Sequence, residues 1–399
     1  MVGTETSQFD NNPITPIRQY PITMSNPTTN ILVLADYLPD SGWGGGVIIR
    51  SLLENIPNDV TLSWTTFSVE RNQKNSKVNN INILPFKPRY IRGQGKFKLI
   101  RKLDSLLFAS DLNQIIKKNN IQLLWIICGV TYNELYRLSV LSTQLTIPFH
   151  ITVHDDPIVE LESTKKEEGK VLFQTLLSNA KSVDVISNRM RDSYKTQYNI
   201  NAIVITRGIP SNFPTNSLRD STSINVLMGG YGNVPSPWPL PLIEAMELMQ
   251  NDQPSFLHLF DSKLSKWKNE YTIIYENMPE AAFNQVLKTI DIGYACDDLN
   301  PARLAFAQLS LPTKIITYIG AGIPFVYHGP QDSTVGDLLK QYEAGIIVST
   351  NDSKQLYDAF YKLRTNYEYY QQQCLLALQN QFAAKIVQYR FYNYILNNS

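Results

Sequence analysis

The sequence predicts an α/β protein of two doubly wound domains, each with a mostly parallel sheet covered by helices on both faces. Three observations favour this fold class. The chain of 399 residues is too long for one ordinary hydrophobic core. Continuous apolar runs alternate with helical stretches, a pattern typical of strands buried inside a parallel sheet. The order strand, glycine-rich turn, helix opens both halves of the chain, after residue 30 and again after residue 223.

The composition excludes several classes of protein. A net charge of +1 argues against a nucleic-acid partner, which needs a basic face. Cys128, Cys296 and Cys374 lie far apart and fit core thiols in a reducing compartment, and four histidines without ligand spacing argue against a metal site. No apolar run reaches the ~20 residues of a membrane helix. Residues 1–29 resemble a flexible tail rather than a signal peptide, so we expect a cytoplasmic protein.

The first domain is expected to open with a strand over residues 31–35, a glycine-rich loop and a helix over residues 47–53. The carboxyl end of this strand is where a doubly wound sheet binds ligands. The loop does not match the dinucleotide fingerprint G-x-G-x-x-G, and a turn that only needs positive φ angles is the alternative to a binding loop. The candidate residues are Gly44, Gly45 and Gly46.

Strands and helices alternate along the rest of the chain, as a doubly wound protein requires. The predicted strands cover residues 60–67, 81–84, 123–128, 149–153, 183–186, 203–205, 224–228, 256–260, 271–275, 290–295, 325–327 and 346–348. The predicted helices cover residues 99–118, 134–145, 168–179, 239–249, 335–342 and 352–363, with a helix that starts at residues 278–280 and amphipathic helices between residues 367 and 396.

A basic segment interrupts the first half between residues 87 and 102. It contains two glycines and no acidic residue. Such a loop suits docking on an anionic surface, including peripheral contact with the inner face of a membrane, or on a phosphate-bearing, lipid-linked acceptor. A solvated loop is the alternative. Its cations are Lys87, Arg89, Arg92, Lys96, Lys98, Arg101 and Lys102.

A polar turn follows the predicted strand of residues 149–153. Pro157 directs the preceding residue away from helical backbone, so His154 and Asp155 are expected in an ordered turn at the ligand-binding edge. We assign His154 as a candidate catalytic residue that hydrogen-bonds a ligand hydroxyl or phosphate, with Asp155 orienting it. A structural histidine is the alternative. Asp155 and Asp156 are adjacent on extended backbone and point apart, which argues against a metal site.

The stretch from Ser310 to Thr334 organises the second half. Two helices are expected to begin within it, at Thr313 and at Ser333, near the carboxyl ends of neighbouring strands. The free N–H groups and positive dipole ends of helix starts favour a phosphate, and Lys314 adds a full charge beside the first. The stretch therefore predicts a site for the pyrophosphate of a nucleotide, with Lys314, Ser333 and Thr334 binding the donor.

The motifs of this stretch also carry a resemblance to a known family. They are Pro312-Thr313-Lys314, Tyr318, Ala321-Gly322-Ile323-Pro324 and His328-Gly329-Pro330. Together they resemble the donor-binding segment of GT-B glycosyltransferases, in particular bacterial members related to glycosyltransferase family 4. The resemblance implies two Rossmann-like domains that face a cleft, with the C-terminal helix crossing back to the first domain. The implied segments are an acceptor domain over 30–210, a linker over 211–223, a donor domain over 224–375 and a returning helix over 376–399.

The resemblance implies an enzyme that moves a sugar from a nucleotide-diphosphate sugar to an acceptor hydroxyl, in glycan, polysaccharide or glycolipid synthesis. Retention of configuration, without a metal or other cofactor, is part of the same implication. The first glycine loop would face the cleft near the distal phosphate and the acceptor, and Gly230 would approach the donor. Arg207 would reach the cleft or form a surface ion pair. Residues 233–238 contain no cation, although relatives commonly carry one there.

The chain departs from family 4 at two acidic positions. Thr317 and Leu309 stand where the resemblance places the glutamates that hold the ribose and the donor sugar. Either Asp297 or Asp298 compensates from the preceding loop, or hydroxyl groups such as that of Thr317 and backbone groups suffice. Two alternatives follow from this departure: a non-catalytic GT-B subunit that binds sugar or nucleotide, and a GT-B sugar-nucleotide epimerase or hydrolase.

Overall fold

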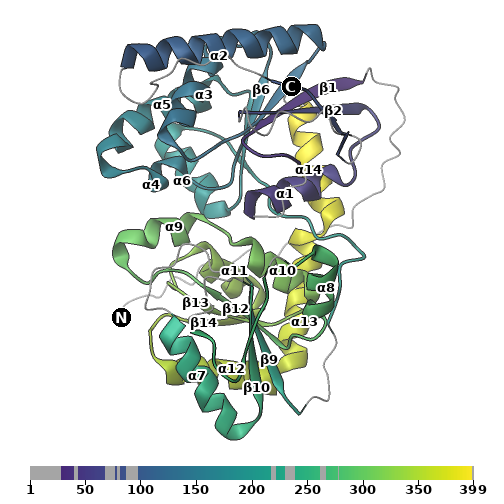
Figure 1. Cartoon of the computed structure of the whole chain (residues 1–399), viewed down its shortest axis with the longest axis vertical. Coiled ribbons are helices and arrows are strands. Elements are labelled where there is room, and N and C mark those ends of the chain that lie inside the picture. Colours follow the sequence, from purple (N-terminus) through teal and green to yellow (C-terminus); the bar gives the residue numbers. More distant parts are fainter. Residues whose placement is uncertain are drawn as a thin grey trace, which may run out of the picture.

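Two sheets, one in each half of the chain, form the framework of the protein (Figure 1). The structure is a computed structural model, and it describes residues 28–39, 44–67, 77–78, 81–86, 98–216, 222–229, 239–260, 267–276 and 278–397. Most of the predicted tail, the basic segment before residue 98, Gly230 and the loop of residues 233–238 lie outside the described residues. No described helix has both the length and the apolar character that crossing a membrane requires.

Eight strands form the first sheet, in the order β3-β4-β2-β1-β5-β6-β7-β8. Neighbouring strands are parallel except for β3 and β4. The strands are β1 (Thr29–Ala35), β2 (Val60–Thr66), β3 (Lys77–Val78), β4 (Ile81–Ile83), β5 (Leu123–Ile127), β6 (Phe149–Val153), β7 (Ser182–Val185) and β8 (Ile203–Val204). The accompanying α-helices are α1 (Gly44–Leu53), α2 (Lys98–Lys118), α3 (Tyr132–Ser142), α4 (Pro157–Glu160), α5 (Lys166–Asn179) and α6 (Asn188–Tyr198).

Six parallel strands form the second sheet, in the order β11-β10-β9-β12-β13-β14. The strands are β9 (Ile224–Met228), β10 (Ser255–Leu259), β11 (Thr272–Ile274), β12 (Ile292–Cys296), β13 (Phe325–His328) and β14 (Gly345–Val348). The helices are α7 (Pro239–Asp252), α8 (Glu280–Leu287), α9 (Leu304–Leu309), α10 (Thr313–Ala321), α11 (Thr334–Tyr342), α12 (Ser353–Thr365), α13 (Tyr367–Ala377) and α14 (Ala384–Asn397).

The strand order reverses beside the first strand of each sheet, where β1 lies between β2 and β5 and β9 lies between β10 and β12. Parallel α/β sheets bind ligands at such switch points, outside the carboxyl ends of the strands. The central strands are buried on both faces, and β5 is fully apolar and fully buried. The predicted fold class, two Rossmann-like doubly wound domains, is confirmed.

The C-terminal helix α14 returns to the first domain, as predicted. The ring of Phe391 packs 4.6 Å from that of Trp125 in β5, measured between ring centroids. The Tyr392 hydroxyl donates to the carbonyl of Leu52 at 3.0 Å, so α14 is also bound to the end of α1. Helix α13 packs in the second domain, and Figure 1 shows the two helices running from one domain to the other.

Every predicted strand and helix is present, with bounds within three residues of the prediction. Helices α4, α6 and α9 and the two-residue strand β3 were not predicted. Helix α6 buries only Met190 and Tyr194, so its sequence has no clear apolar face to detect. Gly322 is the C-cap residue of α10 and has a φ of 66°, in the left-handed region. Glycine adopts this conformation at little cost, so the helix ends at a glycine, as predicted.

Candidate functional site

A cavity of about 540 Å³ lies between the two domains and brings together seven of the predicted site residues. Its lining comes from segments that follow β1 and β6 in the first domain and β12 in the second, and from the start of α10. The carboxyl ends of the two sheets therefore face a common space. The predicted residues that line it are Gly44, Gly45, His154, Asp155, Asp297, Asp298 and Lys314.

His154 lies in the wall of this cavity, one residue after β6. Its side chain is buried, with 8% of the residue exposed, and its Nε2 atom has no hydrogen-bond partner among the described residues. Burial lowers the pKa of His154 to about 4, although the charge of Asp184 acts in the opposite direction. At neutral pH the imidazole is therefore uncharged, and its Nε2 atom is a buried polar group without a described partner.

The start of α1 packs directly against this imidazole. A Cβ atom added to Gly45 would lie 2.5 Å from Nδ1 of His154, closer than atoms can approach without displacement. Gly44 has a φ of 27°, which a glycine adopts at little cost. Both glycines line the cavity, whereas Gly46 is buried within α1 and is not among its lining residues. Glycine is needed here because the helix backbone approaches the histidine ring.

The start of α10 lies on the second-domain side of the cavity, where Thr313 and Lys314 are lining residues. Pro312 occupies the N-cap position and makes no side-chain cap hydrogen bond, and the first turn contains no acidic residue. This nine-residue helix therefore presents its N–H groups and the ammonium group of Lys314 at the cavity. Such an end favours an anion.

Asp155 forms a contact between the two domains. Its carboxylate accepts a long hydrogen bond of 3.5 Å from the hydroxyl of Ser310. Burial, together with the charge of Glu160, raises the pKa of Asp155 to about 6, and the Ser310 bond partly offsets this. A carboxyl group with such a pKa can exchange a proton near neutral pH.

Two further carboxylates enter the cavity from the loop after β12. Asp297 accepts a hydrogen bond from the Tyr327 hydroxyl at 2.8 Å. Burial raises the pKa of Asp297, whereas Tyr327 and the charge of Lys314 lower it. Asp298 accepts from the backbone N–H of Asn300 at 2.9 Å and lies 3.9 Å from the guanidinium of Arg303. The loop thus places negative charge close to the cation at the start of α10.

Arg207 and Thr317 contact each other outside the lining of the cavity. Nη1 of Arg207 donates to the hydroxyl of Thr317 at 2.5 Å, and the guanidinium carbon lies 5.4 Å from the ring centroid of Phe213. Burial and the nearby charge of Arg50 lower the pKa of Arg207 to about 10. This pair therefore joins the end of the first domain to α10.

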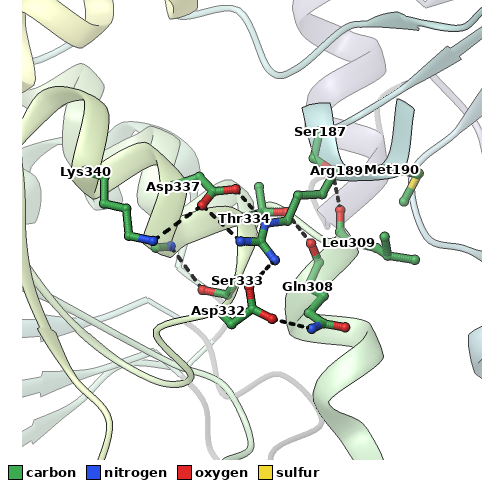
Figure 2. Close-up of polar contacts among 11 residues, drawn as sticks. Ser187, Arg189, Met190, Gln308, Leu309, Asp332, Ser333, Thr334, Asp337 and Lys340 are labelled. Atoms are coloured by element: carbon green, nitrogen blue, oxygen red, sulfur yellow. Dashed lines mark hydrogen bonds and ion pairs between the residues drawn. The ribbon is translucent and has the colours of Figure 1, made fainter. Parts of the chain in front are cut away.

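The start of α11 is closed by protein groups, as Figure 2 shows. The hydroxyl of Ser333 accepts a hydrogen bond from the N–H of Gly336 at 3.0 Å, and the hydroxyl of Thr334 donates to the carbonyl of Gln308 at 2.7 Å. Ser333 is fully buried, and neither residue is among those that line the cavity between the domains. Of the two helix starts predicted to hold the pyrophosphate, only that of α10 faces this space.

Arg189 of α6 covers the same end of α11. Its guanidinium donates to Asp332 at 2.6 Å and to Asp337 at 2.5 Å and 3.0 Å (Figure 2). Hydrogen bonds from Arg189 lower the pKa of both carboxyl groups. The cluster joins the two domains, because α6 belongs to the first and α11 to the second.

Two charged residues of the cavity were missed in the sequence. Glu160 lies in the four-residue helix α4, and Arg303 lies in a short 3-10 turn before α9. Residues 296–301 form a polar stretch that ends in Asn300-Pro301, two positions before Arg303, and this stretch could have indicated Arg303. No local pattern marks Glu160.

Comparison with known proteins identifies the fold. No protein-family model matches the sequence, and no curated protein sequence matches it. Among solved structures, sucrose-phosphate synthase from Thermosynechococcus elongatus gives a TM-score of 0.69 at 13% identity, covering 93% of this chain and 100% of that one. A glycosyltransferase from Rickettsia africae ESF-5 gives a TM-score of 0.66 at 15% identity with the same coverage.

HepE of Anabaena, solved in complex with UDP-glucose, gives a TM-score of 0.64 at 13% identity, covering 92% of this chain and 99% of that one. At these identities the similarity concerns the fold. The fold of two Rossmann-like domains is thus shared with these solved structures. The chain has the GT-B fold.

Proposed function

We propose that the chain is a glycosyltransferase that moves a sugar from a nucleotide-diphosphate sugar to an acceptor hydroxyl. One observation carries the proposal: the uncapped start of α10, with Lys314, shares a cavity with a buried histidine whose Nε2 has no described partner. The first feature suits a diphosphate and the second a polar group of the sugar. Binding of UDP-glucose by HepE, which has the same fold, supports this choice of donor class.

In the proposed reaction the bond between the anomeric carbon and the diphosphate breaks while the acceptor oxygen bonds to that carbon, and the proton of the acceptor hydroxyl passes to the departing diphosphate. Charge develops on the departing diphosphate oxygen in the transition state. The N–H groups at the starts of α10 and α1 and the ammonium group of Lys314 stabilise it. These fixed charges take the place of a metal ion in the proposed mechanism, and addition of a chelator is expected to leave the rate unchanged.

In this proposal His154 contacts the donor sugar nucleotide, and Asp155 lies on the side where the acceptor binds. The neutral imidazole of His154 hydrogen-bonds a sugar hydroxyl or the departing phosphate through Nε2. Retention of configuration and the relationship to glycosyltransferase family 4 belong to this proposal through the motif from Pro312 to Pro324. The acceptor is proposed to be a glycan or a lipid-linked saccharide that enters from the side of the first domain.

Calorimetric titration with UDP, GDP and the corresponding sugar nucleotides tests the proposal. We expect one of the two diphosphates to bind at the cavity, and its sugar nucleotide to support transfer to a saccharide acceptor. His154→Ala should lower the transfer rate by on the order of 100-fold with little change in affinity for the diphosphate, because it removes a contact made mainly in the transition state. Failure of every nucleoside diphosphate to bind would remove the basis of the proposal.

A sugar-nucleotide epimerase or hydrolase is a second candidate, because Asp155, Asp297 and Asp298 all line the same cavity. Paired carboxyl groups of this kind support acid–base chemistry at an anomeric carbon. Incubation of the bound sugar nucleotide without an acceptor separates the two functions. A new sugar nucleotide or free sugar indicates the second candidate, and an unchanged donor that reacts only with acceptor indicates the transferase. Binding without turnover indicates a non-catalytic subunit.

A further inference from the structure

Helix α2 carries the most exposed large apolar side chain among the described residues. Leu99 is 78% exposed, and Leu103 and Leu106 are 51% and 36% exposed. At spacings of four and three residues these leucines lie on one face of the helix. Figure 1 shows α2 along the edge of the first domain that is farthest from the second. The leucine stripe therefore lies far from the cavity between the domains.

The opposite face of α2 is fixed in the core of the first domain. Phe108, Leu112 and Ile116 are buried there. Asp104 forms a buried ion pair with Arg137 at 3.0 Å. Because these contacts hold the helix in one orientation, the leucine stripe cannot rotate inward. The stripe is thus exposed among the residues that the structure describes.

The exposed residues of α2 other than leucine are polar or positively charged, and none of them is acidic. Lys98 and Lys102 flank the leucines on one side of the helix, while Lys117 and Lys118 lie near its end. Lys98 is 3.9 Å from Glu168 of α5, so part of its charge is offset. The sequence immediately before α2, outside the described residues, adds four cations and no acid: Lys87, Arg89, Arg92 and Lys96.

We propose that the outer face of α2 docks on an anionic lipid surface, with Leu99, Leu103 and Leu106 inserted among the acyl chains and the lysines at the headgroups. A 21-residue helix with an apolar stripe flanked by lysines suits this position, because lysine stems lie along apolar surface while their ammonium groups reach the phosphates. A two-fold contact between two copies of this face would bring lysines against lysines. This inference goes beyond the proposed function and does not depend on it.

Flotation of the full chain with lipid vesicles tests the inference without any donor or acceptor. The probes are vesicles of phosphatidylcholine alone and of phosphatidylcholine mixed with phosphatidylglycerol. We expect binding to the mixed vesicles that weakens as salt is raised, and weak binding to phosphatidylcholine alone.

Two variants separate the apolar and the electrostatic contributions. The triple change Leu99→Ser, Leu103→Ser and Leu106→Ser should reduce the partition coefficient on mixed vesicles at least about tenfold. Lys98→Glu with Lys102→Glu should reduce binding to mixed vesicles by about tenfold or more and leave phosphatidylcholine binding unchanged. The matched control replaces exposed leucines of the second domain, Leu248→Ser with Leu376→Ser, and should bind like the unmodified chain.

Circular dichroism and thermal unfolding of each variant establish that the fold is intact. Because all of the replaced side chains are exposed, we expect unchanged unfolding midpoints. Absence of binding to mixed vesicles would overturn the inference, as would equal binding of the leucine variant and the unmodified chain. A dimer of the unmodified chain that becomes a monomer in the leucine variant would also overturn it, since a second copy would then cover the stripe.

Discussion

Helices α10 and α11 have equal length, follow each other in the same domain and begin near the same edge of the sheet, yet their starts differ. At α10 the cap residue is Pro312, which makes no side-chain cap bond, and the first turn lines the cavity. At α11 the side chain of Ser333 caps the helix and Arg189 joins the two aspartates beside it (Figure 2). An open start is available to a ligand, whereas a closed start contributes to stability.

The largest effect is expected from a substitution at the open start of α10. Lys314→Ala should weaken binding of the nucleotide diphosphate by on the order of 100-fold and leave the affinity for the nucleoside nearly unchanged, because only the diphosphate meets the ammonium group. Titration calorimetry with UDP and uridine, or with GDP and guanosine, measures both. Lys340→Ala on α11 is the matched control and should bind like the unmodified chain. Equal losses for diphosphate and nucleoside would remove the role assigned to Lys314.

The carboxyl groups at the two sites are expected to respond to pH in opposite directions. Burial raises the pKa of Asp155, to about 6, so its protonated form stabilises the folded state at low pH. This contribution is lost as pH rises from about 4 through about 6. The free energy of unfolding of the unmodified chain should therefore fall by about 2 kcal/mol over this range relative to Asp155→Asn. Urea denaturation at a series of pH values measures the difference.

Asp337 provides the comparison for the pH experiment. The hydrogen bonds from Arg189 lower its pKa, so its ionised form stabilises the folded state. That contribution is present above the ordinary pKa of an aspartate and is lost as pH falls through the lowered value. Asp337→Asn should therefore lower the free energy of unfolding at neutral pH. On acidification this variant should lose less of that free energy than the unmodified chain does. If the free energy of unfolding changed with pH in the same way for Asp155→Asn and Asp337→Asn, the expected contrast between the two sites would be contradicted.

The cap of α11 should matter for stability alone. Ser333→Ala leaves the N–H of Gly336 without its partner and is expected to cost about 1 kcal/mol in the free energy of unfolding. Because Ser333 does not line the cavity, the affinity for the nucleotide diphosphate should not change. Urea denaturation and titration calorimetry on the same preparation measure the two quantities. A loss of affinity comparable with that of Lys314→Ala would show that the start of α11 also holds the ligand.

The smallest effect is expected at the ion pairs across the domains. Arg189→Ala removes both contacts with Asp332 and Asp337, but these carboxylates are largely exposed, so the expected cost is below about 1 kcal/mol. The effect should shrink further in high salt. Thermal unfolding at low and high ionic strength measures it. A large loss that does not depend on salt would indicate that Arg189 holds the domains by more than charge.

Much of the candidate site could be predicted from the sequence because its signals are local. The glycines before α1, the turn at His154 and the lysine beside Pro312 each lie next to a buried strand or a helix start, and these positions are where α/β domains bind ligands. The contacts that the sequence did not predict join residues from distant parts of the chain. Arg207 bonds Thr317 across 110 positions, and no spacing in the sequence announces such a pair.

Local sequence patterns alone predict the strands, most helices and the two doubly wound domains, because apolar periodicity and turn residues act over a few neighbouring positions. Which helix start remains open depends instead on packing between distant parts of the chain. Arg189 and Asp332 are 143 positions apart, and the side chain that occupies the end of α11 arrives from the other domain. The free N–H groups of a helix are a local feature, whereas what binds them depends on everything that packs nearby.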